Sequence, residues 1–509
     1  MRISTCISVL ACLMVLTSCT RHPSLPDSYH TQRRQPRIAP DYTDVEVPPN
    51  IAPLNFKVLE GSDECVALVT LPDGSTQTYG QGKNICFPLS QWRRMTAKSV
   101  GHSIKVEIFA KDAIGEWHRY APFGIAVVED SIDAYCSYRL ISPSYVAYEM
   151  LSINQRNLTN FDEREVYNNM IINSERTGQC INCHAYQNYR TRNMQFHMRQ
   201  GFGGTMVVYD GHPTKVDLKT DSTISSGVYP AWHPTLPLIA YSTNSTGQSF
   251  HTKNHDKIEV EDSRSDIILY DVLRNEVSPI QMRDDEFEVF PWWAPDGKTL
   301  YYCSAHFEFS DSVEREAQVI ERYKDIQYDI YKRSFDPSTY RFGPAQLVYA
   351  ASRHNASATL PRISPDGRYL LFAQGHHGCF HVWHPDADLY ITDLRTLRTR
   401  RLENVNSSDA ESYHVWSSNG RWILFVSRRD DGNYSRLYIA HFDKDGHAHK
   451  AFELPQKDPD FYDFFLRSYN VPEFMTEPVT ISSQAFSAAA KLDARKATFV
   501  SQATGPMAP

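Results

Sequence analysis

The 509-residue sequence lacks the signals of several common protein classes. After its N-terminal segment it has no run of about 18 apolar residues, so we expect no transmembrane helix there. The net charge of −8 gives no basic excess, so nucleic acid is not an expected partner. There is no glycine-rich phosphate loop, no nucleophile elbow and no HExxH motif. These absences leave nucleotide binding, serine hydrolysis and zinc proteolysis without a sequence signal.

The composition favours a β-rich protein of more than one domain. Aromatic residues make up 12% of the chain, which also contains 29 prolines and 29 tyrosines. Such a composition is more typical of strands and turns than of helices. The length predicts two or three domains.

The first residues predict export from the cytoplasm. A basic start, Met1-Arg2, is followed by an apolar run at 7–16 that is too short to span a bilayer as a mature helix. The next residues, Leu16-Thr17-Ser18-Cys19, resemble the bacterial lipobox, which implies cleavage after a signal peptide at 1–18 and lipidation of Cys19. An ordinary secretory signal is the alternative. We therefore expect a lipid-anchored protein of the bacterial cell envelope, on the outer membrane and facing the periplasm.

The strongest chemical motif is a CxxCH sequence formed by Cys180, Cys183 and His184. This spacing is the attachment signature of c-type haem, because two thiols add to the two haem vinyl groups while the histidine binds the iron. The alternatives are half of a zinc site and a redox dithiol. A zinc site needs a second ligand pair, and a thioredoxin-like dithiol needs a βαβ setting. Neither is found in the sequence, so the predicted cofactor is covalent haem c with its iron.

An electron-carrying haem needs a second axial ligand. The run 193–198 offers Met194, His197 and Met198, which would share one face at helical spacing. Met194 and His197 are the favoured candidates. A methionine ligand would raise the reduction potential and a second histidine would lower it. His233 and His251, from the later chain, remain open.

Five cysteines are left once the signal, lipid and haem residues are assigned: Cys65, Cys86, Cys136, Cys303 and Cys379. An odd number implies a free thiol or an intermolecular bond. Cys65 and Cys86 are the favoured disulfide, because both lie in predicted strands of one small domain.

The chain is predicted to contain three folded parts after a polar tether at 19–44. Alternating apolar runs separated by turns at 45–140 indicate a β-sandwich. The first half of the haem segment, 141–204, shows helical patches without a sustained period and is interpreted as mixed helix and loop. Residues 205–470 repeat a strand–turn–strand unit, which predicts a β-propeller of five to seven blades. The tail, 471–509, reads as a helix fragment with a loose end.

Four repeat units are plain in the sequence, and each pairs two strands around a tight turn. They occupy 229–242, 290–302, 360–372 and 413–425. The turns Pro-Asp-Gly and Ser-Asn-Gly suit positive φ angles. These units resemble the TolB-type propeller repeat, although the first and fourth depart from Ser-Pro-Asp-Gly. The TolB-like resemblance implies a protein-binding surface. With the lipobox and CxxCH, the chain resembles a group of Bacteroides-type lipoproteins, and this resemblance supports the architecture more than a mechanism.

Other polar clusters are weaker candidates. Glu259, Glu261, Asp262 and Asp266 form an acidic run that a solvated strand or loop would also explain. His376-His377 could bind a metal from a predicted loop. His251 and His255 could face the haem.

We expect a monohaem c-type cytochrome that transfers electrons and uses the propeller to dock an unidentified redox or protein partner. Two alternatives stay open. One is a propeller scaffold with a structural haem, and the other is a haem enzyme with an open axial position for a small substrate.

Overall fold

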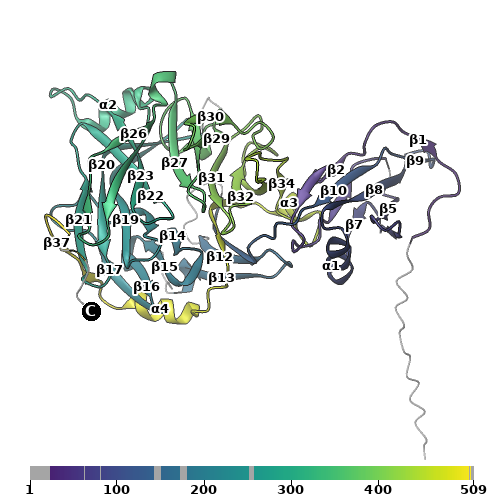
Figure 1. Ribbon diagram of the computed structural model, residues 1–509, viewed down its shortest axis with the longest axis horizontal. Helices are drawn as coiled ribbons and strands as arrows, with labels where there is room; N and C mark the ends of the chain where they lie inside the picture. The colour runs from purple at the N-terminus through teal and green to yellow at the C-terminus, as the bar shows by residue number, and fades with distance from the viewer. Residues whose placement is uncertain are drawn as a thin grey trace, which may run out of the picture.

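The computed structural model describes residues 23–61, 63–80, 82–142, 151–171, 180–251, 257–503 and 505. The chain is mainly β, as the composition predicts. Figure 1 shows an N-terminal domain beside a larger body of radiating sheets. Among these residues no helix has the length and apolarity needed to cross a membrane.

The N-terminal domain combines a seven-stranded sheet with a three-stranded sheet, β2–β4–β7. Helix α1 (Leu89–Lys98) was not predicted; it begins after Pro88 and buries Trp92 and Met95 in the core. The strands are β1 (His30–Thr31), β2 (Ile38–Ala39), β3 (Val45–Val47), β4 (Phe56–Val58), β5 (Cys65–Thr70), β6 (Thr76–Tyr79), β7 (Asn84–Ile85), β8 (His102–Lys111), β9 (Trp117–Arg119) and β10 (Phe123–Val127).

The larger body is a β-propeller, and its described residues form six blades. Blade 1 is β14 (Ile181–Gln187), β15 (Arg190–Met198), β16 (Gly204–Tyr209) and β17 (His212–Asp217). Blade 2 is β18 (Val228–Trp232), β19 (Leu238–Phe250), β20 (Ile258–Asp271) and β21 (Glu276–Gln281). Blade 3 is β22 (Glu286–Trp293), β23 (Thr299–His306), β24 (Asp329–Asp336), β25 (Arg341–Phe342) and β26 (Gln346–Tyr349). A single parallel pairing, Ser265 with Phe287, joins blades 2 and 3.

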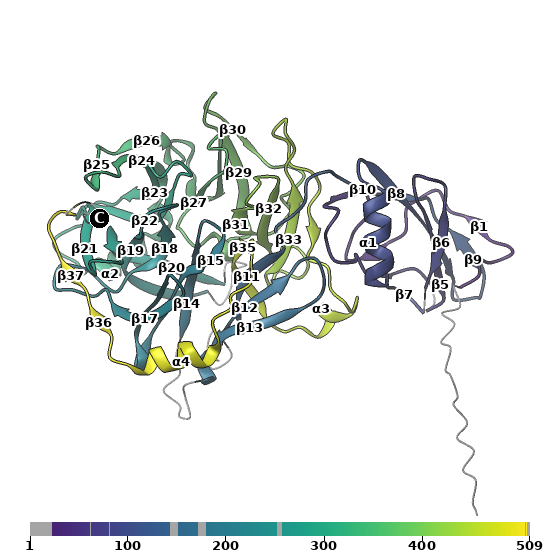
Figure 2. The same cartoon turned by 60° about the horizontal axis from the view of Figure 1, so that its bottom comes forward.

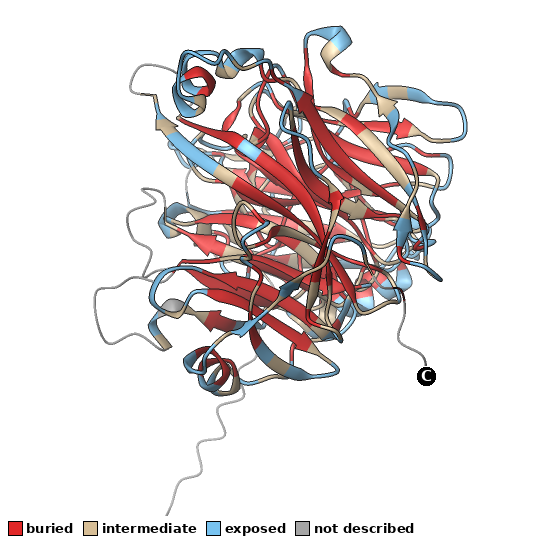
Figure 3. Ribbon diagram, turned by 90° about the vertical axis from the view of Figure 1, so that its left-hand side faces the viewer, coloured by how far each residue is buried: buried red, intermediate tan, exposed pale blue. Residues whose placement is uncertain are grey.

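The next two blades are separate four-stranded sheets. Blade 4 is β27 (Ser357–Ile363), β28 (Tyr369–Gly375), β29 (Asp388–Asp393) and β30 (Arg398–Arg401). Blade 5 is β31 (Glu411–Trp416), β32 (Trp422–Ser427), β33 (Arg436–His441) and β34 (Phe452–Glu453). Two short helices, α2 (Arg315–Glu321) and α3 (Phe461–Phe464), lie in connections. The inner strands, such as β31 and β32, are buried along their length, whereas outer strands such as β26 and β30 are largely exposed or intermediate (Figure 3).

Blade 6 closes the ring with strands from both ends of the propeller sequence. Its inner strand β35 (Ser468–Met475) pairs antiparallel with β11 (Tyr135–Ile141), which continues to β12 (Ser152–Asn157) and β13 (Glu163–Asn168). The predicted tail is therefore not loose. After α4 (Ser483–Lys491), β36 (Arg495–Lys496) pairs with β17 and β37 (Thr498–Phe499) pairs with β21, as the yellow C-terminal segment in Figure 2 shows.

The interpretation of the first half of 141–204 as mixed helix and loop is wrong, as the described residues of the whole segment show. They form strands of blades 6 and 1, with only short 3₁₀ turns at Asn169–Ile171 and Gln200–Phe202. The propeller sheets therefore begin before residue 205. The helical spacing was misleading because Tyr167, Phe196 and Met198 are buried by neighbouring sheets and α4, a tertiary effect that local periodicity does not encode.

Phe474 lies in β35, the strand that closes the ring, and its side chain is 2% exposed in the main core. We therefore expect its truncation to lower the stability of the protein strongly. Phe474→Ala should lower the free energy of unfolding by about 3 to 5 kcal/mol, because it leaves a cavity beside the closing strand. Phe464→Ala is the control, since Phe464 is 83% exposed. Denaturant unfolding of both variants checks this, and equal losses would contradict a stabilising role for β35.

Candidate functional site

Each blade's inner strand is interrupted at the same level by a β-bulge. At each interruption one non-glycine residue has a positive φ between 45° and 56°: Cys183, Tyr229, Phe290, Leu360, Tyr413 and Val471. Bulges turn the side chains of the interrupted strand to new directions. Positive φ is uncommon for such residues, so the sixfold repetition marks a built feature of the ring.

All six bulge residues line one cavity of about 710 Å³. This volume lies in the range of about 300 to 1,000 Å³ that small-molecule and cofactor sites occupy. Because every blade contributes, the cavity lies on the axis of the ring. A second cavity of about 520 Å³ shares Pro230 and Glu473 with it and is lined by Trp232, Trp292 and Trp293 among others.

The three residues of the CxxCH motif line the first cavity. Cys180 precedes β14, while Cys183 and His184 lie at the bulge inside it. The motif is therefore extended and not helical. The exposed fractions are 9% for Cys180, 6% for Cys183 and 1% for His184, and both cysteines are free thiols. Neither ring nitrogen of His184 has a hydrogen-bond partner within the described part of the chain.

The electrostatics keep His184 and Cys183 uncharged. Burial, helped by the Arg139 charge, lowers the pKa of His184 to about 3, so its imidazole is neutral at physiological pH. Burial raises the pKa of the Cys183 thiol. A neutral imidazole is the form that binds a metal. A buried imidazole without a partner is costly, and a metal bond would satisfy one of its nitrogens.

The candidates for a second axial ligand do not share a face. Because β15 is a strand, side chains alternate: Met194, Phe196 and Met198 join the hydrophobic core, while His197 lines the cavity. Burial lowers the pKa of His197 to about 3, and its Nδ1 lies 3.3 Å from Thr205 Oγ1. Among the described residues lining the cavity, His197 is the only histidine or methionine besides His184.

Three arginines place positive charge around the cavity: Arg139, Arg199 and Arg362. Arg139 is held by the Ile181 carbonyl at 3.2 Å and by Asn470 Oδ1 at 3.0 Å. Burial raises the pKa of Glu473 to about 8, and the backbone N–H of Tyr186 donates to its Oε2 at 3.2 Å. The cavity can therefore accept a ligand that carries carboxylate groups.

The residue that follows the bulge residue is of two types among the six blades of the described chain. It is proline in four of them, Pro230, Pro291, Pro361 and Pro472, and histidine in the other two, His184 and His414. The four repeat units recognised in the sequence begin at the bulge residues Tyr229, Phe290, Leu360 and Tyr413, and Cys183-His184 aligns with the first two residues of each unit. That alignment was the available signal that the CxxCH motif belongs to the propeller repeat.

The remaining candidates lie elsewhere. His233 Nε2 contacts the Gly297 carbonyl at 2.8 Å, and neither His233 nor His251 lines the cavity. Cys19 and His255 lie outside the described residues. The favoured Cys65–Cys86 disulfide is absent from the structure: both are free thiols, and Cys65 Sγ donates to the Gly82 carbonyl at 2.9 Å.

Two residues from the weaker candidate clusters, Glu259 and His377, do lie close together. Glu259 Oε2 lies 3.2 Å from Nε2 of both His377 and His384, and all three residues are buried. Glu261 and Asp262 contact other groups, and His376 pairs with Asp386. The two histidines lower the pKa of Glu259 to about 2 against the opposing effect of its burial.

Comparison with known proteins shows neither a family nor an activity. The sequence matches no protein-family model, and no curated protein matches it. Similar solved structures include a prolyl endopeptidase (14% identity, TM-score 0.35, 63% of this chain and 42% of that one). They also include the β-propeller domain of the trilobed protease from Pyrococcus furiosus (11%, 0.26, 67% and 79%). A third is a putative 6-phosphogluconolactonase from Bacteroides uniformis (12%, 0.31, 77% and 98%). The chain spans about two fifths of the prolyl endopeptidase.

In the described residues the protein is a six-bladed β-propeller whose axial cavity is lined by thiols and histidines.

The buried His414 predicts a pH-dependent stability. Burial, followed by the Arg362 charge, lowers its pKa to about 3, whereas an unfolded chain protonates it near 6.5. Between these values the unfolded state binds the extra proton, so stability falls as pH falls, by up to about 1.4 kcal/mol per pH unit. In urea unfolding between pH 7.5 and 5, His414→Gln should lose less stability than the wild type.

His447→Gln is the control for that series, because the His447 side chain is 70% exposed. Its curve should run parallel to the wild type. A His414→Gln curve that is also parallel would contradict the neutral, buried state of His414.

Proposed function

We propose that the protein is a monohaem c-type cytochrome of the bacterial cell envelope that transfers electrons. The observation that carries the proposal is the convergence of Cys180, Cys183 and the buried His184 on one cavity of about 710 Å³. Each thiol would add across one haem vinyl group, forming a carbon–sulfur bond while its proton goes to the other vinyl carbon. No oxidant is needed for this addition. Haem bound there would supply a one-electron redox centre.

The residues of the cavity suit this cofactor. His184 offers a neutral imidazole whose nitrogens have no competing partner among the described residues. Arg139 and Arg199 can hold the two carboxylate groups of haem. Apolar residues such as Phe290 and Leu360 would pack against part of the haem ring and lower the effective dielectric there.

His197 is the proposed second axial ligand, in place of Met194. Its ring lines the same cavity, whereas Met194 is fully buried in the core cluster behind β15. Two imidazole ligands would give a lower reduction potential than a histidine–methionine pair.

A haem enzyme is the second candidate, and the size of the site favours it. The second cavity of about 520 Å³ adjoins the first at Pro230 and Glu473, which leaves room for a small substrate beside the cofactor. In this case the position opposite His184 would be open. Carbon monoxide binding to the reduced protein separates the two candidates, because a six-coordinate iron resists it.

The same proposal includes a lipid anchor at Cys19 and a location on the periplasmic side of the outer membrane. It also includes a TolB-like role of the propeller in docking a partner. The lipobox-like sequence and the repeat units support them. A propeller scaffold with a structural haem would share this location.

Loss of the attachment residues tests the cofactor assignment. With c-haem maturation factors supplied, Cys180→Ala/Cys183→Ala should carry no covalent haem, and His184→Ala should lose the low-spin spectrum. Cys136→Ala is the control, because Cys136 is a buried thiol that does not line the cavity. Haem-stained denaturing gels and absorption spectra measure both effects. Covalent haem in the double variant would refute the attachment site.

The two ligand candidates can be separated by parallel variants. His197→Ala should open the iron to carbon monoxide and shift the reduction potential, whereas Met194→Ala should leave both unchanged apart from lost core stability. Spectroelectrochemistry with and without carbon monoxide measures this. If the wild type binds carbon monoxide as readily as His197→Ala, the electron-transfer proposal fails in favour of the enzyme.

A further inference from the structure

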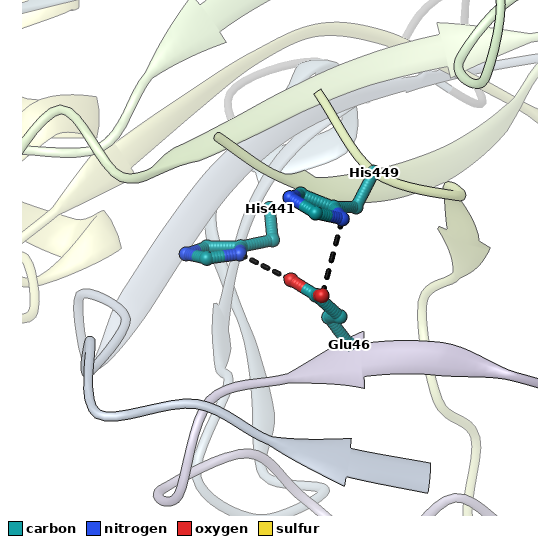
Figure 4. Close-up of side chains that lie close together, drawn as sticks. All are labelled: Glu46, His441 and His449. Carbon is teal, nitrogen blue, oxygen red and sulfur yellow. Dashed lines mark hydrogen bonds and ion pairs between the residues drawn. The ribbon is translucent and has the colours of Figure 1, made fainter. Parts of the chain in front are cut away.

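A second cluster of metal-ligand side chains lies where the N-terminal domain meets blade 5. It consists of Glu46 on β3, His441 at the end of β33 and His449 in the loop that follows (Figure 4). The three ligand atoms lie within 4.8 Å of one another. One ion with ligands at about 2 Å can bridge such a set after small side-chain adjustments.

The backbone places the two imidazoles side by side. The His449 N–H donates to the His441 carbonyl at 2.9 Å across a turn in which Gly446 has a φ of 90°. The rings are stacked with centroids 5.4 Å apart, and the Trp422 ring packs against His441 at 4.9 Å. Both Nδ1 atoms face the same carboxylate: His441 Nδ1 lies 2.5 Å from Glu46 Oε2 and His449 Nδ1 lies 3.1 Å from Glu46 Oε1.

The opposite nitrogen of each ring faces another carboxylate. His441 Nε2 lies 3.4 Å from Asp130 Oδ2, and His449 Nε2 lies 3.0 Å from Asp443 Oδ2. Each ring nitrogen therefore faces a carboxylate oxygen, and an ion held between the two Nδ1 atoms and Glu46 would leave the proton of each ring on Nε2, where a carboxylate accepts it. Carboxylates behind histidines in this way are a recurring feature of metal sites, where they orient the ring and increase its basicity.

The charges also favour a cation. Three carboxylates surround two imidazoles. Lys450 Nζ binds Asp41 at 2.8 Å, whereas Arg421 donates to the Asp443 carbonyl at 2.9 Å and His447 Nδ1 lies 3.4 Å from Asp443 Oδ2. In the described chain Glu46 forms ion pairs only with His441 and His449. A divalent ion would neutralise this excess of negative charge.

We propose that Glu46, His441 and His449 bind a divalent transition metal of the zinc type, which fastens the N-terminal domain to blade 5. Two imidazoles and one carboxylate suit zinc and leave a fourth position for water. The ion reaches the cluster from solvent, because the Glu46 and His449 side chains are 26% and 33% exposed. Direct contacts already join the two parts, such as Ser418 with Asp133, and the metal would add a cross-link to them.

Zinc uptake by the full-length protein tests the site. The chelator-treated full-length protein is titrated with zinc chloride, and bound zinc is counted by elemental mass spectrometry. Glu46→Gln and His449→Asn should each bind one zinc fewer per chain than the wild type. Asp443→Asn should bind it about 10- to 100-fold more weakly. His354→Asn is the control, because His354 is an exposed histidine that belongs to none of the metal-ligand clusters among the described residues.

Hydrogen exchange tests the bridging role in the same samples. Zinc should slow amide exchange in β3 and around His449 in the wild type and leave Glu46→Gln unchanged. Equal zinc counts in all variants would overturn the site, since uptake would then come from another cluster such as Glu259, His377 and His384. A zinc count that falls without protection of β3 would overturn the cross-link. Neither result depends on the haem proposal.

Discussion

The pairing of β35 with β11 is the constraint on which the rest of the structure depends. It brings together strands more than 300 residues apart, and through β12 and β13 it completes the sixth blade. The same pairing supplies Arg139 from one strand and Asn470, Val471 and Glu473 from the other to the axial cavity. Without it the cavity would lose one wall, and His184 would lie at an open edge exposed to water.

Ring closure brings the repeated bulges of the six inner strands together around one cavity. One bulge in each inner strand points toward the axis, and five of the six bulge residues are aromatic or aliphatic. In blade 1 the bulge residue is Cys183. The next residue is His184, whereas four other blades have a proline at that position. The proposed haem attachment is thus a chemical substitution within the repeat, and the other blades supply most of the apolar surroundings and two of the three arginines, Arg139 and Arg362.

The sequence predicted much of the fold because its signals were local. Turn residues such as Pro295-Asp296-Gly297 identify the blades, and the CxxCH spacing identifies the motif without any knowledge of structure. Other features could not be predicted locally. Assigning Met194 and His197 to one face assumed a helix, and only the pairing of β15 with β14 and β16 places them on opposite faces. The Glu46 cluster joins residues about 400 positions apart, which no sequence window contains.

The central claim is that Cys180 and Cys183 hold one covalent haem on the axis of the propeller. The most direct test is the intact mass of the wild-type protein purified with c-haem maturation factors, together with its absorption spectrum. The account predicts a mass increase of one haem that survives denaturation, and a Soret band. A protein that folds with the mass of the polypeptide and its anchor alone, and without a Soret band, would contradict it.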